Sequence, residues 1–375
     1  MSRLRSPSCA PRSATPPSSL PDPGGVRVLH IDSGREYRGG QDQVRLLMRE
    51  LSGVAGLEQR LMTRRASTLA RRVAAHGGRV REVPWGPSLD PRALWRLYLE
   101  AADFHPKILH AHDSHALQLA YWTRRLSGRG AGDPVLVATR RVDFHVGPHS
   151  VWHRVDRVIA ISEAVRAILV ADGLGARDIA VVPSGVDAEE IRRSAATPYN
   201  VRGRLGLPAS TPLAANVAAL VGHKDQHTLL RAAHAARAAR PDLHWVIAGE
   251  GELRASLQET RARLGLDDRV HLLGQVAEAD ALIADADVLV MSSKEEGLGS
   301  VVLHALALGK PVVATRGGGL PEIVPPEWLS PIGDADALAR NVVRALEHVP
   351  APSLPPRYTA AAMAAGVVAL YRSLV

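Results

Sequence analysis

The chain has 375 residues, of which 46 % are apolar, so it is long enough for two domains with full cores. Its formal net charge of +8 favours an anionic partner such as nucleotide phosphates, anionic lipid or nucleic acid, although arginines spread along the chain explain the basic balance equally well. Cys9 is the only cysteine, which excludes an internal disulfide and a cysteine-based metal site.

The sequence predicts no transmembrane helix, because it has no run of about 18 or more strongly apolar residues. Residues 1–25 are rich in Pro, Ser and Arg, lack the apolar centre of a secretory signal, and cannot bury enough apolar surface to become ordered. We therefore expect a disordered tail on a cytoplasmic protein, with peripheral contact at the inner face of an anionic membrane left open.

Short apolar runs alternate with helical patterns over residues 26–195, which predicts a first domain built on a parallel sheet covered on both faces. Strands are expected at residues 26–32, 59–63, 80–83, 108–111, 136–139, 158–161 and 179–182. Helices are expected at residues 42–51, 91–102, 116–125 and 163–171, where apolar residues recur at helical spacing. Such sheets bind ligands outside the carboxyl ends of their strands, so the residues after each strand are the candidates.

Two of these segments carry glycines or histidines. Gly39 and Gly40, between the first strand and its helix, form a candidate phosphate or sugar cradle, although a plain turn is the commoner explanation. Strand alternation puts His110 and His112 on one face, but the spacing fixes no third ligand, so we predict no metal site. A structural histidine at a strand end remains the alternative for His112.

A third segment holds Arg140 and Arg141, which follow the strand at residues 136–139 and precede the carboxylate of Asp143. Paired arginines of this kind are candidates for holding an anionic acceptor, or form a surface ion pair. The Pro-Ser-Gly-Val-Asp run at residues 183–187 has the turn chemistry of a hinge, and it is expected to lead towards the second domain.

The second domain is expected at residues 208–350, with strands at 212–220, 244–248, 270–273 and 286–291. Helices are expected at 228–239, 253–264 and 335–348. The Gly249–Gly251 turn is too short for a dinucleotide fingerprint. A proline-rich break then precedes an apolar helix at residues 358–374.

The most informative stretch follows Met291. Gly297 and Gly299 relieve the backbone so that it can approach a ligand closely, and Ser300 is expected to cap the next helix. The N-terminus of a helix suits a phosphate, because free N–H groups and the helix dipole point at it. Glu296 would repel a phosphate and is better explained as an acceptor for hydroxyl groups. The residues alone therefore predict a ligand with phosphate and polyol parts, such as a nucleotide sugar.

The same stretch carries a family resemblance. The run Glu296-Gly-x-Gly-x4-His304-Ala, followed by Gly-x-Pro-Val-Val at 309–313 and Gly-Gly-x-Pro-Glu at 318–322, resembles the nucleotide-sugar signature of family-4 retaining glycosyltransferases of the GT-B fold. That signature is normally Glu-x7-Glu, and His304 stands at its second carboxylate position. The resemblance implies two Rossmann-like parallel-sheet domains facing across a cleft, with the donor on the second, the acceptor on the first, and residues 351–375 crossing back to the first.

The resemblance also implies roles for individual residues. His112 would lie beside the transferred sugar, Glu296 would grip sugar hydroxyls, and Lys224 would neutralise the donor diphosphate, although Ala219 stands where the family has an arginine. The remaining donor-binding candidates are Gly39, Gly40, Gly274 (near the nucleobase), Gly297, Leu298, Gly299, Ser300 and His304. Because imidazole cannot copy the bidentate grip of a carboxylate on ribose, His304→Glu is expected to tighten donor binding.

The leading hypothesis is a retaining transferase that moves a sugar from a nucleoside diphosphate sugar to a cell-surface glycan or a lipid-linked precursor, with no cofactor besides the donor. Two alternatives remain open: a non-catalytic nucleotide-sugar-binding partner, favoured by His304 and Ala219, and a nucleotide-sugar epimerase on the same architecture. A nucleic-acid-binding protein is disfavoured, because the chain lacks interleaved basic and aromatic residues.

Overall fold

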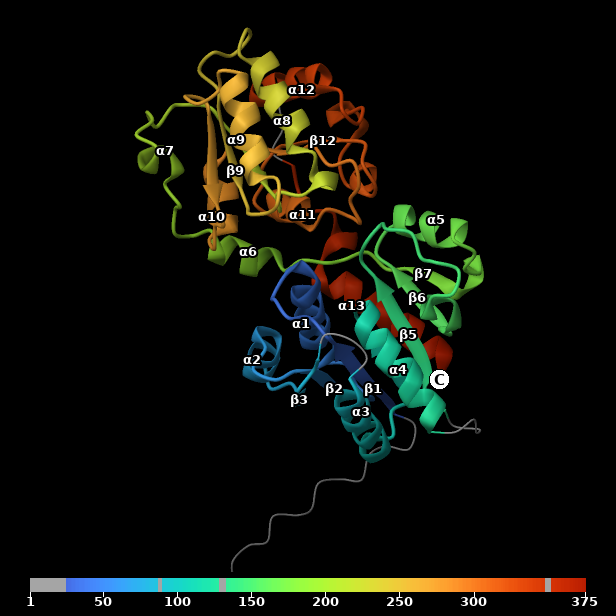
Figure 1. The fold of residues 1–375 in the computed structure, drawn as a ribbon. Helices are drawn as coiled ribbons and strands as arrows, with labels where there is room; N and C mark the ends of the chain where they lie inside the picture. Colours follow the sequence, from blue (N-terminus) through green and yellow to red (C-terminus); the bar gives the residue numbers. More distant parts are fainter. Residues whose placement is uncertain (1–24, 87–89, 128–132, 348–351) are drawn as a thin grey trace, which may run out of the picture.

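The computed structural model of the chain describes residues 25–86, 90–127, 133–347 and 352–375. It consists of two α/β domains in contact with each other (Figure 1). The tail expected at residues 1–25 lies outside the described residues, apart from Gly25. Each domain is built on a parallel sheet, which confirms the predicted fold class.

The first sheet has seven strands, and all neighbouring strands are parallel. Its central strand β4 is buried at every position, as expected for a parallel strand covered on both faces. The spatial order is β3 (Val80–Val83), β2 (Leu57–Arg64), β1 (Val26–Asp32), β4 (Ile108–Ala111), β5 (Val135–Arg140), β6 (Arg157–Ala160) and β7 (Ile179–Val181).

The helices of the first domain connect consecutive strands. They are α1 (Gly39–Leu51), α2 (Thr68–Ala75), α3 (Pro91–Phe104), α4 (Ser114–Leu126) and α5 (Glu163–Ala171), with the 3-10 turns η1 (Val151–Arg154) and η2 (Ala176–Asp178). The short helix α2 was not predicted.

The second sheet has six parallel strands. Their order is β10 (Val270–Gly274), β9 (His244–Ala248), β8 (Leu213–Val217), β11 (Val288–Met291), β12 (Val312–Thr315) and β13 (Leu329–Ser330). The later helices are α6 (Ala188–Ser194), α7 (Val201–Arg204), η3 (Gly222–Lys224), α8 (Gln226–Ala236), α9 (Arg254–Arg263), α10 (Ala279–Asp285), α11 (Ser300–Ala307), η4 (Leu320–Glu322), η5 (Pro326–Trp328), α12 (Ala335–Glu347), η6 (Pro356–Tyr358) and α13 (Ala360–Leu374).

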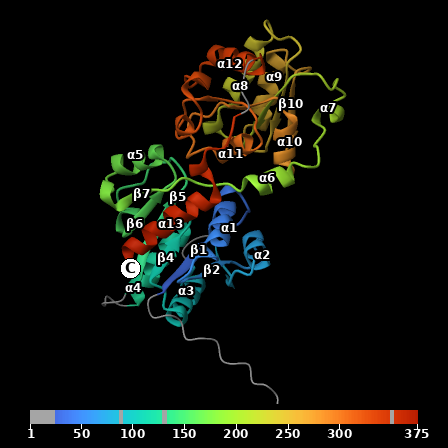
Figure 2. The same cartoon turned by 180° about the vertical axis from the view of Figure 1, so that it is seen from behind.

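The final helix α13 returns from the second domain and packs on the first sheet, as the view from behind shows (Figure 2). Its buried residues Met363, Val367 and Tyr371 share a hydrophobic cluster with Leu47 of α1 and Ile108 of β4. The approach is close, since a Cβ atom on Gly366 would lie 2.9 Å from the Val182 side chain. The second half of the chain thus contributes to the core of the first domain.

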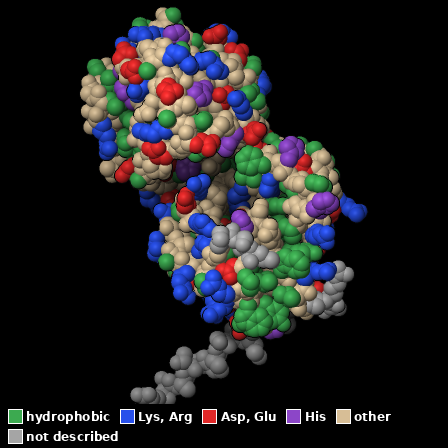
Figure 3. All heavy atoms as spheres, in the orientation of Figure 1, with side chains coloured by type: hydrophobic (Ala, Val, Ile, Leu, Met, Phe, Trp, Pro, Cys, Tyr) green, Lys and Arg blue, Asp and Glu red, His purple; other side chains and the backbone are tan. Residues whose placement is uncertain are grey.

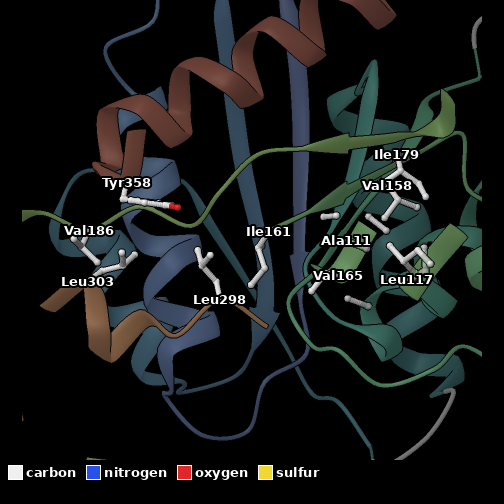
Figure 4. Close-up of a cluster of buried hydrophobic side chains, with 14 of the residues drawn as sticks. Ala111, Leu117, Val158, Ile161, Val165, Ile179, Val186, Leu298, Leu303 and Tyr358 are labelled. Carbon is white, nitrogen blue, oxygen red and sulfur yellow. The ribbon is translucent and has the colours of Figure 1, made fainter. Parts of the chain in front are cut away.

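The two domains also share a hydrophobic contact (Figure 4). Leu298, from the glycine loop after β11, points toward Ile161, which follows β6, and Leu303 of α11 lies next to Val186. A polar contact reinforces this junction, because Ser162 Oγ donates to the Gly297 carbonyl at 2.6 Å.

The Glu322 carboxylate adds a second polar contact between the domains. It accepts the Glu163 and Ala164 backbone N–H groups, each at 3.0 Å, and so satisfies free donors at the start of α5.

Two local predictions need correction. Helix α1 begins at Gly39 rather than at residue 42, because Arg38 is the extended N-cap and both glycines take helical conformation. Ser300 does not cap α11; the N-cap is Gly299, with φ +92°, and Ser300 is the first helical residue. A left-handed glycine turns the chain directly into the helix, so no side-chain cap is formed.

The three glycines at 317–319 do not make room for a ligand in this structure. Cβ atoms on Gly317 and Gly318 would collide with the carbonyl oxygens of Ser293 and Glu296, and one on Gly319 would lie 2.5 Å from that of Gly297. This glycine run therefore lies directly against the Glu296 loop and supports it.

Candidate active site

The N-termini of α1 and α11 meet where the two domains face each other. A Cβ atom on Gly39, the first residue of α1, would lie 3.5 Å from Ser300 Oγ, the first residue of α11. Each helix leaves free backbone N–H groups at this end, and each dipole places partial positive charge there. The junction is therefore suited to an anion held between the domains.

Lys224 and Glu296 form an ion pair beside this junction. Their side chains are mostly buried, with 16 % and 14 % of their surfaces exposed. Ser293 Oγ is 3.4 Å from the same Glu296 oxygen, and Ser292 Oγ donates to the Lys224 carbonyl at 2.9 Å, which holds η3 against the loop. The structure thus brings two of the predicted catalytic residues into direct contact.

Leu298 is a core residue rather than a surface contact for a ligand. Its side chain is 2 % exposed and packs within the cluster that joins the domains. Gly297 is equally constrained, because a Cβ atom there would collide with the Arg141 carbonyl oxygen of the first domain. Both residues position the loop, and any contact they make with a donor would come from backbone groups.

His304 on α11 is paired with a carboxylate that the sequence did not point to. His304 Nδ1 lies 2.6 Å from Asp280 Oδ1 in the first turn of α10, and Ser194 Oγ donates to Asp280 Oδ2. Burial would raise the pKa of the Asp280 carboxyl, but the hydrogen bonds from His304 and Ser194 bring it below its usual value. A carboxylate therefore stands one helix away from the position where the family motif carries its own.

His304 and Asp280 line a cleft of about 490 Å³ between the domains, whereas Lys224 and Glu296 are not among its lining residues. The first domain contributes Gly39 and the charged side chains Asp42, Arg45 and Arg72 from α1 and α2, and the second domain contributes His304. The remaining lining residues are Tyr37, Arg38, Leu46, Val186, Asp187, Glu190, Ile191, Ser194 and Ala277.

His112 belongs to a buried histidine cluster at the carboxyl ends of β1 and β4. His112 Nε2 and His30 Nδ1 share a hydrogen bond of 3.0 Å, while His110 bonds Tyr371 OH at 2.5 Å and Thr139 Oγ1 at 2.7 Å. Burial lowers the pKa of His30 to about 3 and holds those of His110 and His112 well below the ordinary value. All three rings are therefore neutral near pH 7.

The three rings also offer nitrogens within 4.8 Å of one another, the grouping that a metal would need. His30 is the third ring that sequence spacing could not supply, since it comes from the neighbouring strand β1. However, both His110 nitrogens already have partners. Hydrogen bonding thus accounts for His110, and among the described residues only His30 Nε2 and His112 Nδ1 of this cluster are left without one.

Arg141 places a cation next to His112 and Gly40. Its Nη1 donates to the His112 carbonyl at 3.4 Å, and its Cδ would lie 3.7 Å from a Cβ atom on Gly40. Burial lowers the pKa of Arg141 to about 10, whereas Asp32 and Asp113 act in the opposite direction, so it is charged near pH 7. Its buried Nε atom has no hydrogen-bond partner in the described part of the chain.

Two further sequence candidates fall elsewhere. Gly274 ends β10 with φ +75°, and its carbonyl accepts the Gly249 N–H at 2.8 Å, but it is not among the residues that line the cleft. Arg140 is buried and donates to the Phe144 carbonyl at 2.5 Å, so it is occupied within its own loop. The sequence analysis missed Asp280 because helix α10 is short and was not predicted. Its only signal in the sequence was His304, which stands where the family motif has a carboxylate.

Known families match both domains of the chain. Residues 23–190 match the family model described as Glycosyltransferase Family 4, and residues 211–348 match the one described as Glycosyl transferases group 1. Among solved structures, Anabaena Alr3699/HepE in complex with UDP and glucose superposes with a TM-score of 0.76 at 18 % identity, over 93 % of this chain and 100 % of that chain. At that identity the likeness shows the fold.

Two curated relatives match over parts of their length. The lipopolysaccharide core biosynthesis glycosyltransferase LpsE of Rhizobium meliloti (strain 1021) is 34 % identical over 150 residues, 38 % of this chain and 41 % of that protein. A GDP-mannose-dependent monoacylated alpha-(1-6)-phosphatidylinositol monomannoside mannosyltransferase of Corynebacterium glutamicum is 34 % identical over 180 residues, 44 % of this chain and 46 % of that protein. The chain thus spans less than half the length of both.

The two family matches fall on the two sheets in turn, and the structural likeness runs across both. Residues 23–190 therefore form a domain that matches Glycosyltransferase Family 4, and residues 211–348 form one that matches Glycosyl transferases group 1, in the two-domain arrangement of the GT-B fold.

Proposed function

We propose that the protein is a retaining glycosyltransferase that uses a nucleoside diphosphate sugar as donor. The observation that carries this proposal is the meeting of the α1 and α11 N-termini beside the Lys224–Glu296 pair. Phosphate oxygens need cationic and N–H partners, and sugar hydroxyls need acceptors. Both kinds of partner occur here within one interdomain junction.

The donor diphosphate would lie at the two helix N-termini, with Lys224 as one cation. Ala219 supplies no charge where the family has an arginine, and we assign that role to Arg141, which comes from the first domain. Arg141 is charged, largely enclosed, and without an ion pair among the described residues. A donor phosphate would compete with Glu296 for Lys224 and would release the Glu296 carboxylate toward sugar hydroxyls.

The ribose would be held by Asp280 together with His304. An imidazole ring has at most one acceptor nitrogen, so it cannot accept from both ribose hydroxyls. The Asp280 carboxylate lines the interdomain cleft together with His304. Its two oxygens can accept hydrogen bonds from both ribose hydroxyls. His304 then positions this carboxylate by its 2.6 Å hydrogen bond.

In the transfer step, a bond forms between the acceptor oxygen and the anomeric carbon while the bond from that carbon to the diphosphate oxygen breaks. The acceptor proton passes to the leaving diphosphate on the same face, which retains the anomeric configuration. Lys224, Arg141 and the helix N-termini would stabilise the charge that develops on the leaving group. His112, neutral and held by His30, would contact the sugar beside the anomeric carbon.

The acceptor we propose is a cell-surface glycan or a lipid-linked precursor. The relatives above act in lipopolysaccharide core biosynthesis and on a phosphatidylinositol mannoside, according to their names, which supports an envelope acceptor for this chain. No described helix has the length and apolar character to cross a membrane.

A non-catalytic nucleotide-sugar binder is the second candidate. The observation in its favour is that Glu296 already neutralises Lys224 in this structure. The two candidates differ in turnover, since both would bind a donor.

The deciding experiment incubates the full-length chain with a panel of UDP- and GDP-sugars and measures thermal stabilisation, release of nucleoside diphosphate, and the anomeric configuration of any product by NMR. Stabilisation with diphosphate release and an axial-to-axial product would support the transferase. Stabilisation without release, across soluble and lipid acceptors, would favour the binder. An inverted product would refute retention.

A further inference from the structure

Four large apolar side chains are exposed on two neighbouring helices of the first domain. On α3, Trp95 and Leu99 are 59 % and 45 % exposed, and on α4, Trp122 and Leu126 are 44 % and 59 % exposed. Each pair is spaced by four residues, so each lies along one helix face. Figure 3 shows hydrophobic side chains gathered over α3 and α4 on one side of the molecule. We call these four residues the α3–α4 apolar surface.

The fold does not require this surface. Helix α3 buries Ala93, Leu97, Ala101 and Phe104, and α4 buries Ala116, Leu117, Leu119, Ala120 and Thr123. The stripe that faces the sheet is therefore complete on both helices without the four exposed side chains. Clustered exposed apolar residues of this size mark an interaction site in soluble proteins.

Charged side chains of both signs lie on and beside the same two helices. Arg96 on α3 and Arg125 on α4 are exposed, and neither has an ion pair within the described ranges. The carboxylates of α3, Glu100 and Asp103, are both bound by Arg60 at 2.8 Å. The surface thus combines apolar anchors with free cations.

We propose that the α3–α4 apolar surface docks on an anionic lipid membrane. Tryptophan is enriched at the boundary between lipid and water, where its ring is buried and its N–H group remains hydrated. Arginines beside such a surface are attracted to acidic lipid headgroups. A helix pair that lies on a membrane in this way needs no spanning segment.

A second copy of the chain is a poorer occupant. In a symmetric dimer each surface patch faces itself, so Arg96 and Arg125 of one copy would lie near the same residues of the other. An acidic membrane offers the opposite charge to both arginines.

The position of the surface relative to the active site is consistent with this partner. Helix α4 begins at Ser114, directly after the His112-Asp113 segment. Trp122 is eight residues further along, or about 12 Å at the rise of an α-helix. A membrane at this face would lie close to the acceptor side of the junction. This inference deepens the proposed function by naming a partner for it.

The test measures binding of the full-length chain to phosphatidylcholine vesicles with and without phosphatidylglycerol, by co-sedimentation at low and high salt. We expect binding to the anionic vesicles only, weakened by salt. The double variants Trp95→Ser/Trp122→Ser and Arg96→Glu/Arg125→Glu should each bind roughly 10-fold more weakly or worse.

Matched controls remove similar groups elsewhere. Val170→Ser/Ile332→Ser deletes side chains that are 39 % and 47 % exposed, and Arg177→Glu reverses a charge that is 93 % exposed. Both controls should bind like the parent. Equal binding to neutral and anionic vesicles, or an equal loss in the controls, would overturn the proposal. So would a dimer, seen by light scattering, that the tryptophan variant dissociates while vesicle binding is absent.

Because the vesicle assay contains neither donor nor acceptor, it is independent of the proposed function. Transfer to a water-soluble acceptor should be the same in the tryptophan variant and the parent. If transfer fails in every assay while vesicle binding follows the expected pattern, the proposed transferase activity is refuted and the proposed membrane docking is supported.

Discussion

His304 Nδ1 and Asp280 Oδ1 lie 2.6 Å apart, so a carboxylate from the neighbouring helix α10 lies directly against position 304. This contact joins α11 to α10, and Ser194 extends it to α6 between the domains. The place that differs from the family motif is therefore a hydrogen-bonded unit of three residues rather than a simple loss of a charge.

This relationship changes the expectation for position 304. The single variant His304→Glu would place a second carboxylate against Asp280, and like charges in a partly buried site repel. We expect His304→Glu to weaken donor binding, and His304→Glu/Asp280→Asn to restore it or tighten it. Calorimetric titration with UDP- and GDP-sugars measures both; tighter binding by the single variant would contradict the assigned role of Asp280.

Asp280→Asn alone removes the charge that would accept the ribose hydroxyls. Loss of a charge-assisted hydrogen bond costs about 1.5–3 kcal/mol, so donor affinity should fall roughly 10- to 100-fold. Asp280→Glu keeps the charge and should lose less. Equal losses in the two variants would indicate a structural role for Asp280.

Lys224→Met and Glu296→Gln each leave one partner of a mostly buried pair without its counter-ion. We expect each to lose about 1–3 kcal/mol of unfolding free energy and roughly 100-fold or more in transfer rate. The double variant Lys224→Met/Glu296→Gln should regain most of the stability but none of the activity. Denaturant unfolding and a transfer assay separate these effects, and recovered activity in the double variant would remove both residues from the chemistry.

Arg141→Gln should weaken donor binding by roughly 10-fold or more, since it removes a charge-assisted contact with the diphosphate. Ala219 is exposed, so Ala219→Arg can introduce the arginine typical of the family without disturbing the core. Added to Arg141→Gln, it should recover much of the lost affinity. A failure of Arg141→Gln to alter binding of the free nucleoside diphosphate would exclude the role proposed for this residue.

The buried histidines predict acid sensitivity. His30, His110 and His112 have lowered pKa values in the folded chain, so below about pH 6.5 the unfolded chain binds more protons and stability falls as pH falls. Each contributes a slope of about 1.4 kcal/mol per pH unit. Asp32, whose pKa burial and Asp113 raise to about 6, acts in the opposite direction between about pH 4 and 6.

The net slope between about pH 4 and 6 should therefore be roughly 3 kcal/mol per pH unit from these four groups. His30→Gln should reduce this slope by about 1.4 kcal/mol per pH unit, the contribution of one proton. Urea unfolding at a series of pH values measures the slope, and an unchanged slope in His30→Gln would mean that His30 is charged in the folded protein.

Much of the fold followed from local patterns. Strands such as β1 and β4 lie at the predicted residues, because short apolar runs bounded by turn residues are typical of strands buried in a parallel sheet. Helix beginnings were less well predicted. Gly39 is the first residue of α1 and Gly299 caps α11, since glycine accepts both helical and left-handed conformations and so marks no boundary by itself.

The sequence by itself determined the strands of the two sheets and the glycine loop after β11, because these depend on neighbouring residues; a nucleotide sugar at that loop stays a prediction. Tertiary structure alone decided which groups meet: His30 with His112 through adjacent strands, Asp280 with His304 through adjacent helices, and Arg141 with the loop of the other domain. Strand order and domain contact bring together residues that are 24 to 156 positions apart in the sequence (304 − 280 and 297 − 141). A pattern of neighbouring residues cannot predict contacts over such separations.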